Sequence, residues 1–170
     1  MIQNTVISLS KMNSDDKLFY REIYTDTNMM QYISQALDET AADKYFKIAL
    51  KLMAKRPTKS LMFVIKLLNT KTKIGIISLR WNQEDKECAE IGVMILKKHQ
   101  RRSYAHMAKN LLIQHSLQQF NVQQLIAICD KENLAANRAN QKLGFRLDQE
   151  FLDKTDNRVK IKWLISEVNI

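Results

Sequence analysis

The chain has 170 residues, of which 45% are hydrophobic and 26% charged, as expected for one globular domain spanning residues 1–170. Its net charge of +9 favours an anionic partner, namely nucleic acid, a membrane surface or a phosphorylated cofactor, with a solvated basic surface as the alternative. No apolar run approaches the roughly 18 residues that span a bilayer. The spacing of Cys88, Cys129 and the three histidines is not that of a metal site. We expect two structural thiols, no bound metal, no membrane association and a cytoplasmic location.

In the first third of the chain, a short strand precedes helices. Residues 4–10 alternate apolar and polar side chains, which predicts a strand. Three helices follow, opened by residues 14–16, by Asp26 or Thr27, and by residues 38–40, each of which can supply an N-cap. The third helix runs through Lys55 and ends before Pro57.

The remaining pattern is dominated by strands. Residues 61–69, 73–81 and 87–96 form three strands joined by polar turns, as in an antiparallel meander. A helix over 103–120, a strand over 124–129 and a helix over 133–143, ended by Gly144, come next. Strands at 145–152 and 158–167 close the chain. This order predicts an α/β (α+β) fold with a single mixed, mostly antiparallel sheet flanked by helices.

A basic segment joins the strand over 87–96 to the helix over 103–120. It reads KKHQRR, residues 97–102, and Ser103 follows. The first N–H groups of a helix lack intrahelical partners and lie at the positive end of its macrodipole, so such a junction can bind phosphate. The alternative is a solvated basic turn with Ser103 as N-cap. A second helix beside it, capped by Asn133, favours an extended phosphorylated ligand.

Three segments resemble the GNAT acetyltransferases. QRRSYA is similar to their pyrophosphate loop, Q/R-x-x-G-x-G/A, with Ser103 in place of the first glycine. NLAANRANQKLGF resembles N-x-A-S-x-R-x-x-E-K-L-G-F of the subgroup that acetylates ribosomal-protein N-termini and related amines. AEIGVMI resembles that subgroup's central strand. The matching positions are Gln100, Ala105, Asn133, Ala135, Arg138, Lys142, Leu143, Gly144 and Phe145.

The resemblance implies acetyl-CoA as cofactor. The backbone of residues 93–96 would pair with the pantetheine arm like an added strand, residues 101–105 would hold the pyrophosphate, and Asn133 would contact the arm near its thiol. The implied cofactor-binding residues are Val93, Met94, Ile95, Leu96, Gln100, Arg101, Arg102, Ser103, Tyr104, Ala105, Asn133 and Arg138.

Two departures from the family pattern carry consequences. Ser103 lacks the freedom of glycine at positive φ, so we expect the loop to use ordinary dihedral angles, or the phosphates to lie slightly farther out. Ala136 and Asn140 replace the serine and the tyrosine that other members place in this helix, which leaves the general acid unassigned and water as a candidate.

Acetyl transfer to an amine needs a base, because amines are mostly protonated at neutral pH. Glu90 is the candidate, with an ion pair to Arg80 as its alternative role. The aromatic side chains either shape the acceptor pocket or belong to the core; they are Tyr20, Tyr24, Tyr32 and Trp81.

The predicted function is therefore an acetyl-CoA-dependent N-acetyltransferase. A protein N-terminus, a polyamine, an aminoglycoside and an amino sugar remain open as acceptors, and so does a homodimer. A catalytically silent acyl-CoA-binding protein is one alternative. A nucleic-acid-binding module is less favoured, because the densest basic segment lies at one strand–helix junction.

Overall fold

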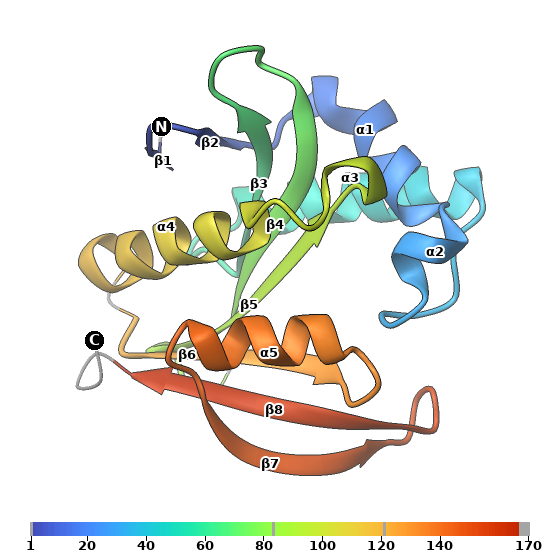
Figure 1. The fold of residues 1–170 in the computed structure, drawn as a ribbon. Coiled ribbons are helices and arrows are strands. Elements are labelled where there is room, and N and C mark those ends of the chain that lie inside the picture. Colours follow the sequence, from blue (N-terminus) through green and yellow to red (C-terminus); the bar gives the residue numbers. More distant parts are fainter. Residues whose placement is uncertain (1, 83, 121, 167–170) are drawn as a thin grey trace.

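The computed structural model describes residues 2–82, 84–120 and 122–166. Its eight strands form one sheet in the order β1-β2-β3-β4-β5-β6-β8-β7 (Figure 1). The strands are β1 (Ile2–Gln3), β2 (Ile7–Lys11), β3 (Ser60–Leu67), β4 (Lys73–Trp81), β5 (Cys88–Ile95), β6 (Gln124–Asp130), β7 (Arg146–Asp153) and β8 (Arg158–Ser166). The helices are α1 (Lys17–Tyr24), α2 (Thr27–Met30), α3 (Glu39–Ala54), α4 (Tyr104–Gln119) and α5 (Leu134–Lys142), with 3₁₀ turns at Ser14–Asp16 and Lys97–His99.

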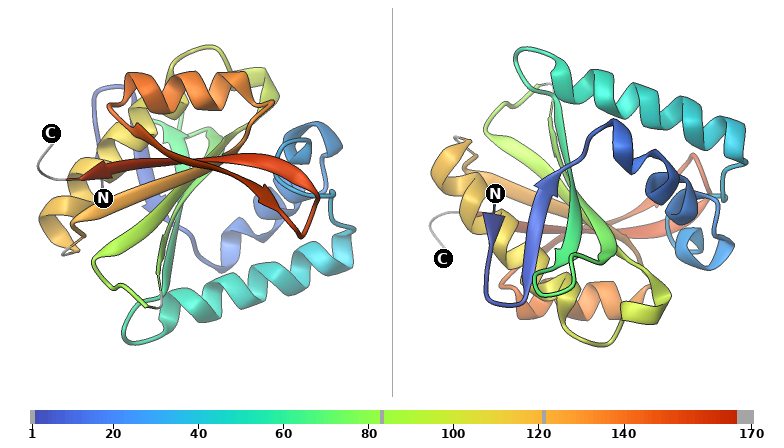
Figure 2. Two further views of the ribbon diagram at one scale, coloured as in Figure 1. Left: turned by 90° about the horizontal axis from the view of Figure 1, so that it is seen from below. Right: turned by 90° about the horizontal axis from the view of Figure 1, so that it is seen from above.

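The mixed sheet predicted from the sequence is confirmed. Among the described residues, β5 and β6 are parallel and every other neighbouring pair is antiparallel. Helices cover both faces (Figure 2). Leu112 of α4 packs on one face with Ile77 and Leu79 of β4, and Phe46 of α3 packs on the other with Val64 and Ile76. Since both faces are covered, the central strands are apolar along most of their length.

The N-terminal boundaries differ from the prediction. The strand expected over 4–10 starts only at Ile7, because the side-chain oxygen of Asn4 accepts the N–H groups of Val6 and Ile7 at 2.8 Å each and forms a turn there. The short strand β1 precedes this turn and was not predicted. The first helical segment is capped by Asn13, outside the predicted 14–16, and its backbone N–H donates to Asp16 at 3.0 Å. Glu167, the predicted end of the last strand, lies outside the described residues.

The feature that positions the site is the divergence of β5 and β6. They pair at only three positions, ending with Glu90 opposite Ile126. Beyond that point β5 continues along β4 as far as Ile95, and β6 continues along β8 as far as Asp130. The two strands therefore separate beyond Glu90 and leave a wedge-shaped gap in the sheet, closed at Glu90 and open towards Ile95 (Figure 1).

Candidate active site

The edge of β5 that faces the gap offers backbone hydrogen-bonding groups. Leu96 N donates to Ile74 O, and Asn82 N donates to Cys88 O, both at 2.9 Å. Because hydrogen-bonded positions alternate along an antiparallel ladder, even-numbered residues of β5 point their backbone groups at β4 and odd-numbered ones point at the gap. Val93 therefore presents both its N–H and its C=O to the gap.

This register narrows the predicted pantetheine contact. Of residues 93–96, Val93 and Ile95 face the gap, whereas Met94 and Leu96 pair with β4. The carbonyl of Ile95 is already used, since Gln100 Nε2 donates to it at 2.9 Å. Gln100 thus ties the basic loop to the end of β5, and Val93 is left as the main point at which an extended ligand could add as a strand.

The loop between β5 and α4 does not use ordinary dihedral angles, so the first of the two expected alternatives was wrong, and the second, phosphates slightly farther out, stays a prediction. Arg101 has φ 61° and Ser103 has φ 60°, both in the left-handed region. Ser103 makes no side-chain cap hydrogen bond. Two left-handed residues within three positions turn the chain sharply from the 3₁₀ turn into α4, and they do so without glycine.

The start of α4 provides unpaired N–H groups. Met107 N donates to Ser103 O at 2.9 Å, the first bond of the helix. The N–H groups of Tyr104, Ala105 and His106 precede that bond and have no partner one turn earlier. The macrodipole adds roughly half a positive charge at this end. The predicted phosphate cradle at residues 101–105 therefore has the donors it requires.

Cations surround this helix end. Lys97, Lys98, Arg101 and Arg102 are exposed, and none of them forms a salt bridge within the described parts of the chain. The Nε2 atom of His99 is buried without a hydrogen-bond partner there, and burial, followed by Lys98 and Arg102, lowers its pKa. An anionic ligand would relieve this accumulation of positive charge.

Helix α5 begins on the same face as α4. Asn133 caps it as predicted, since its side-chain oxygen accepts the Ala136 N–H at 3.1 Å. The amide nitrogen of Asn133 is then the group left to donate to a ligand. Arg138 lies on the exposed side of α5.

Glu90 lies at the closed end of the gap. Its carboxylate accepts a hydrogen bond from Arg80 Nη2 at 2.5 Å, and 28% of its side chain is exposed. The ion pair between Glu90 and Arg80, which the sequence analysis gave as the alternative role of Glu90, is therefore present. Because the Arg80 side chain is 68% exposed, solvent reaches this ion pair. The role of base stays a prediction.

The four aromatic side chains do not gather into a pocket. Tyr20 is 5% exposed and stacks on Tyr24 with ring centroids 4.1 Å apart. Burial raises the pKa of both phenols, and their mutual interaction raises that of Tyr20 further. Trp81 packs edge-on against Phe120, 5.7 Å away on the α4 face. The core alternative holds for these three, and Tyr32 is half-buried.

A buried polar cluster beside the gap was missed at the sequence level. Lys109 of α4 is 5% exposed, and its Nζ donates to Asn140 Oδ1 of α5 at 2.6 Å. Asn140 Nδ2 in turn donates to Cys129 Sγ of β6 at 3.2 Å. Burial raises the pKa of the Cys129 thiol, and the charge of Lys109 partly opposes that rise. The available signal was helical spacing, because Lys109 lies four residues after Ala105 and three before Leu112.

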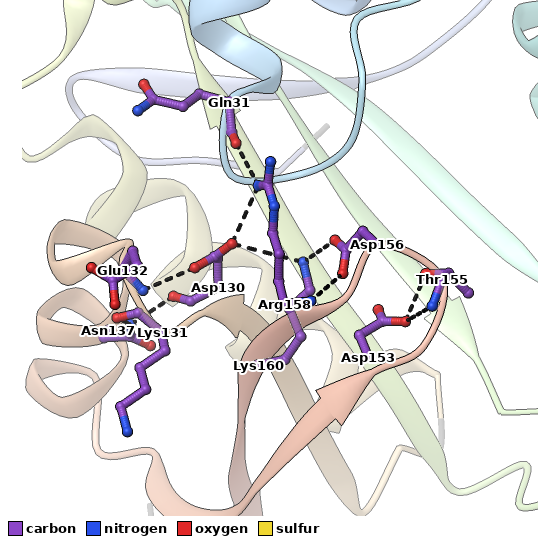
Figure 3. A network of polar contacts seen from close by, with 10 residues as sticks. All are labelled: Gln31, Asp130, Lys131, Glu132, Asn137, Asp153, Thr155, Asp156, Arg158 and Lys160. Carbon is purple, nitrogen blue, oxygen red and sulfur yellow. Dashed lines mark hydrogen bonds and ion pairs between the residues drawn. The ribbon is translucent and has the colours of Figure 1, made fainter.

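An open cleft of about 1020 Å³ lies between the segment after α2 and the turn that joins β7 to β8. Its polar lining includes Gln31, Ser34 and Gln35 from the first segment and Asp153, Asp156 and Arg158 from the second. Arg158 links the two sides, since its Nη1 donates to Gln31 O at 2.6 Å and to Asp130 Oδ2 at 3.3 Å (Figure 3).

This cleft carries an excess of negative charge in a basic protein. Its lining has the carboxylates of Asp153 and Asp156 and one cation, Arg158. Figure 3 shows Lys160 in contact with Asp156 and Asp130 beside them. Lys160 Nζ donates to Asp156 at 2.6 Å and lowers its pKa, and hydrogen bonds from the adjacent Thr155 lower that of Asp153. Both carboxylates are thereby held in the charged form, which suits a cationic ligand. Arg158 of the cleft also contacts Asp130, the last residue of β6.

Residues 7–146 match the family model of the acetyltransferase (GNAT) domain. No curated protein sequence gives a significant match. A similar solved structure is a spermidine N-acetyltransferase from Vibrio cholerae in complex with CoA and spermine, with 18% identity, a TM-score of 0.86 and coverage of 98% of both chains. A GNAT-family acetyltransferase from Bacillus anthracis matches with 19% identity, a TM-score of 0.83 and coverage of 98% of both chains. An acetyltransferase from Salmonella typhimurium that modifies the N-terminal serine of a 50S ribosomal-subunit protein matches with 15% identity, a TM-score of 0.84 and coverage of 97% of this chain and 98% of that one.

At these identities the structural matches show a shared fold, whereas the family model covers most of the chain in sequence. The diverging β5 and β6 strands and the basic start of α4 lie in that matched region. The chain belongs to the GNAT acetyltransferase family.

Proposed function

We propose that the protein transfers the acetyl group of acetyl-CoA directly to a primary amine. The observation that carries this proposal is the free edge of β5 at Val93, which leads directly into the basic, unpaired N-terminus of α4. One extended ligand with a peptide-like arm and a pyrophosphate matches both parts. The solved V. cholerae relative, described with CoA bound, supports the same ligand.

The parts of the site have separate tasks. Val93 and Ile95 align the pantetheine arm, residues 101–105 hold the pyrophosphate with help from Gln100, and Asn133 and Arg138 contact the ligand from α5. When bound, acetyl-CoA supplies the activated acetyl thioester. Glu90, at the closed end of the gap, accepts the proton of the attacking amine.

The acceptor is a cationic amine that enters through the cleft at Asp153 and Asp156. Two solved relatives support amines as a class, one named for spermidine and the other for the N-terminal serine of a ribosomal protein. Polyamines and protein N-termini are therefore the first acceptors to test. The charge excess of the cleft favours the more highly charged polyamine.

A silent acyl-CoA-binding protein is the second candidate. It is favoured by one observation, that Ala136 and the fully buried Asn140 provide no side-chain acid in α5. Thiol release from acetyl-CoA in the presence of amines separates the two, because a silent binder takes up the ligand without releasing thiol.

A cytoplasmic location and a homodimer remain proposals. Within the described residues, no helix is both long and apolar enough to cross a bilayer. Fractionation of cells and sedimentation of the purified protein test these two points.

Calorimetry with acetyl-CoA tests the proposed function. The parent should bind, Arg102→Glu should bind more weakly because it introduces repulsion at the phosphate cradle, and Lys47→Glu should bind like the parent. Lys47 is an exposed residue of α3, on the other face of the sheet, so its variant carries the same change of charge. Absence of binding to the parent would overturn the assignment.

A further inference from the structure

Lys109 is buried in a way that differs from other lysines of this protein. Lys160 is also buried, at 6% exposed, but it forms ion pairs with Asp156 and Asp130. Lys109 forms no ion pair in the described residues; its Nζ has the amide oxygen of Asn140 as hydrogen-bond acceptor and lies 5.8 Å from the centre of the Phe145 ring. Burying a cation without a counter-charge is costly, so this arrangement suggests a negative group that arrives with a ligand.

The cluster lies where the reactive end of the proposed ligand would lie. Glu90 pairs with Ile126, so Cys129 and Val93 are each three residues beyond the last paired position, on opposite sides of the gap. The side chains of Val93 and Cys129 pack against the same core as α4. A ligand held at residues 101–105 enters at the Ile95 end, and its arm runs roughly 3.3 Å per residue towards the closed end. The Cys129–Asn140–Lys109 cluster borders this path at Cys129, on the side of the sheet where α4 packs.

We infer that Lys109, oriented by Asn140, is the cation that stabilises the CoA sulfur and the donor that protonates it during acetyl transfer. The inference rests on the proposed function and supplies the acid that Ala136 and Asn140 do not. Asn140 is a positioning residue, because its amide fixes the lysine on one side and the Cys129 sulfur on the other.

The proposed step balances in protons and electrons. As the amine nitrogen bonds to the acetyl carbon, the carbon–sulfur bond breaks and its electron pair stays on sulfur. A proton from the Lys109 ammonium forms the thiol, and the amine proton leaves through Glu90. Neutral Lys109 regains a proton from water as the products depart, so no further reactant is needed.

Electrostatics favour this role. Burial lowers the pKa of Lys109 from its ordinary value, and the charge of Cys129 partly opposes this, so the buried ammonium is a stronger proton donor than an exposed one. The titratable groups whose charges act on the cluster are Cys129 and Asp130 of β6 and Glu90 of β5; α5 contributes Asn140, which does not titrate.

The test titrates the thiol of bound CoA by the ultraviolet absorbance of its thiolate, after subtraction of the ligand-free protein. Lys109→Met is compared with the parent and with Lys51→Met, which removes an exposed lysine of α3. An opposite charge nearby lowers a pKa by about 1–3 units, so the thiol pKa should rise by that amount in Lys109→Met and stay unchanged in Lys51→Met. Equal thiol pKa values in Lys109→Met and the parent would overturn the inference.

Lys109→Arg separates charge from proton donation. Arginine keeps the cation but does not give up a proton, so the bound thiol should stay acidic while kcat falls about tenfold or more at unchanged KM for acetyl-CoA. Parent-like turnover of Lys109→Arg across the pH range would refute proton donation, and this result decides the question even if Lys109→Met does not fold. Failure of the parent to bind CoA would instead refute the proposed function.

Discussion

Ser103→Gly should stabilise the protein. A non-glycine residue in the left-handed region costs about 1–2 kcal/mol, and Ser103 has φ 60° and ψ 9°. Glycine removes that cost but loses about 0.5–1 kcal/mol more backbone entropy on folding. Since the Ser103 hydroxyl makes no cap hydrogen bond, its removal should cost nothing further, and we expect a net gain of about 0.5–1 kcal/mol.

Thermal unfolding checks this value. For a chain of this size, 1 kcal/mol corresponds to about 2–4 °C, so Tm should rise by about 1–4 °C in Ser103→Gly. Ser103→Ala is the matched control, because it removes the hydroxyl and keeps the strained angle; its Tm should match the parent.

The same pair of variants tests the phosphate cradle. Glycine lets the backbone approach an anion more closely, so calorimetry should show acetyl-CoA affinity equal to or above that of the parent. A sharp loss of affinity in both variants would show that the hydroxyl itself binds the ligand. A lower Tm in Ser103→Gly would refute the strain argument.

Three further predictions concern other parts of the molecule. Glu90→Gln should keep acetyl-CoA affinity and lower kcat by roughly 10²–10⁴-fold; near-parental turnover across the pH range would remove Glu90 from the mechanism. Gly75→Ala should lower the free energy of unfolding in urea by about 1–3 kcal/mol, because the added methyl group would overlap the Met94 carbonyl oxygen. Gly92→Ala should lower it much less, because its methyl group would lie 3.4 Å from Ser78 Oγ. Hydrogen bonds from Arg21 and Lys17 hold the pKa of Asp43 at about 2, below its usual 3.8. Asp43 therefore contributes stability that is present above pH 3.8 and lost as the pH falls towards 2. Asp43→Asn should lose this acid dependence of Tm, and a pH profile of Tm identical to that of the parent would contradict the assignment.

Local sequence patterns were enough to predict the element order and the class of sheet. Apolar runs in the central strands and helical periodicity in α3 and α4 can be recognised without knowing the tertiary contacts. They therefore predicted a mixed sheet covered on both faces. Local side-chain chemistry also identified the cap at Asn133 and the helix end at Gly144, which has φ 88°. The motifs at residues 89–95, 100–105 and 133–145 were sufficient to suggest the family that the family model shows.

Tertiary structure alone decided which side chains meet. The register between β4 and β5 selected Val93 and Ile95 as gap-facing residues, because a backbone pointing direction depends on the partner strand and not on the residue's own type. The left-handed angle of Ser103 is imposed by the sharp turn into α4, against its intrinsic preference. The Lys109–Asn140–Cys129 cluster joins α4, α5 and β6, and the burial of its lysine follows from the packing of three elements that are distant in sequence.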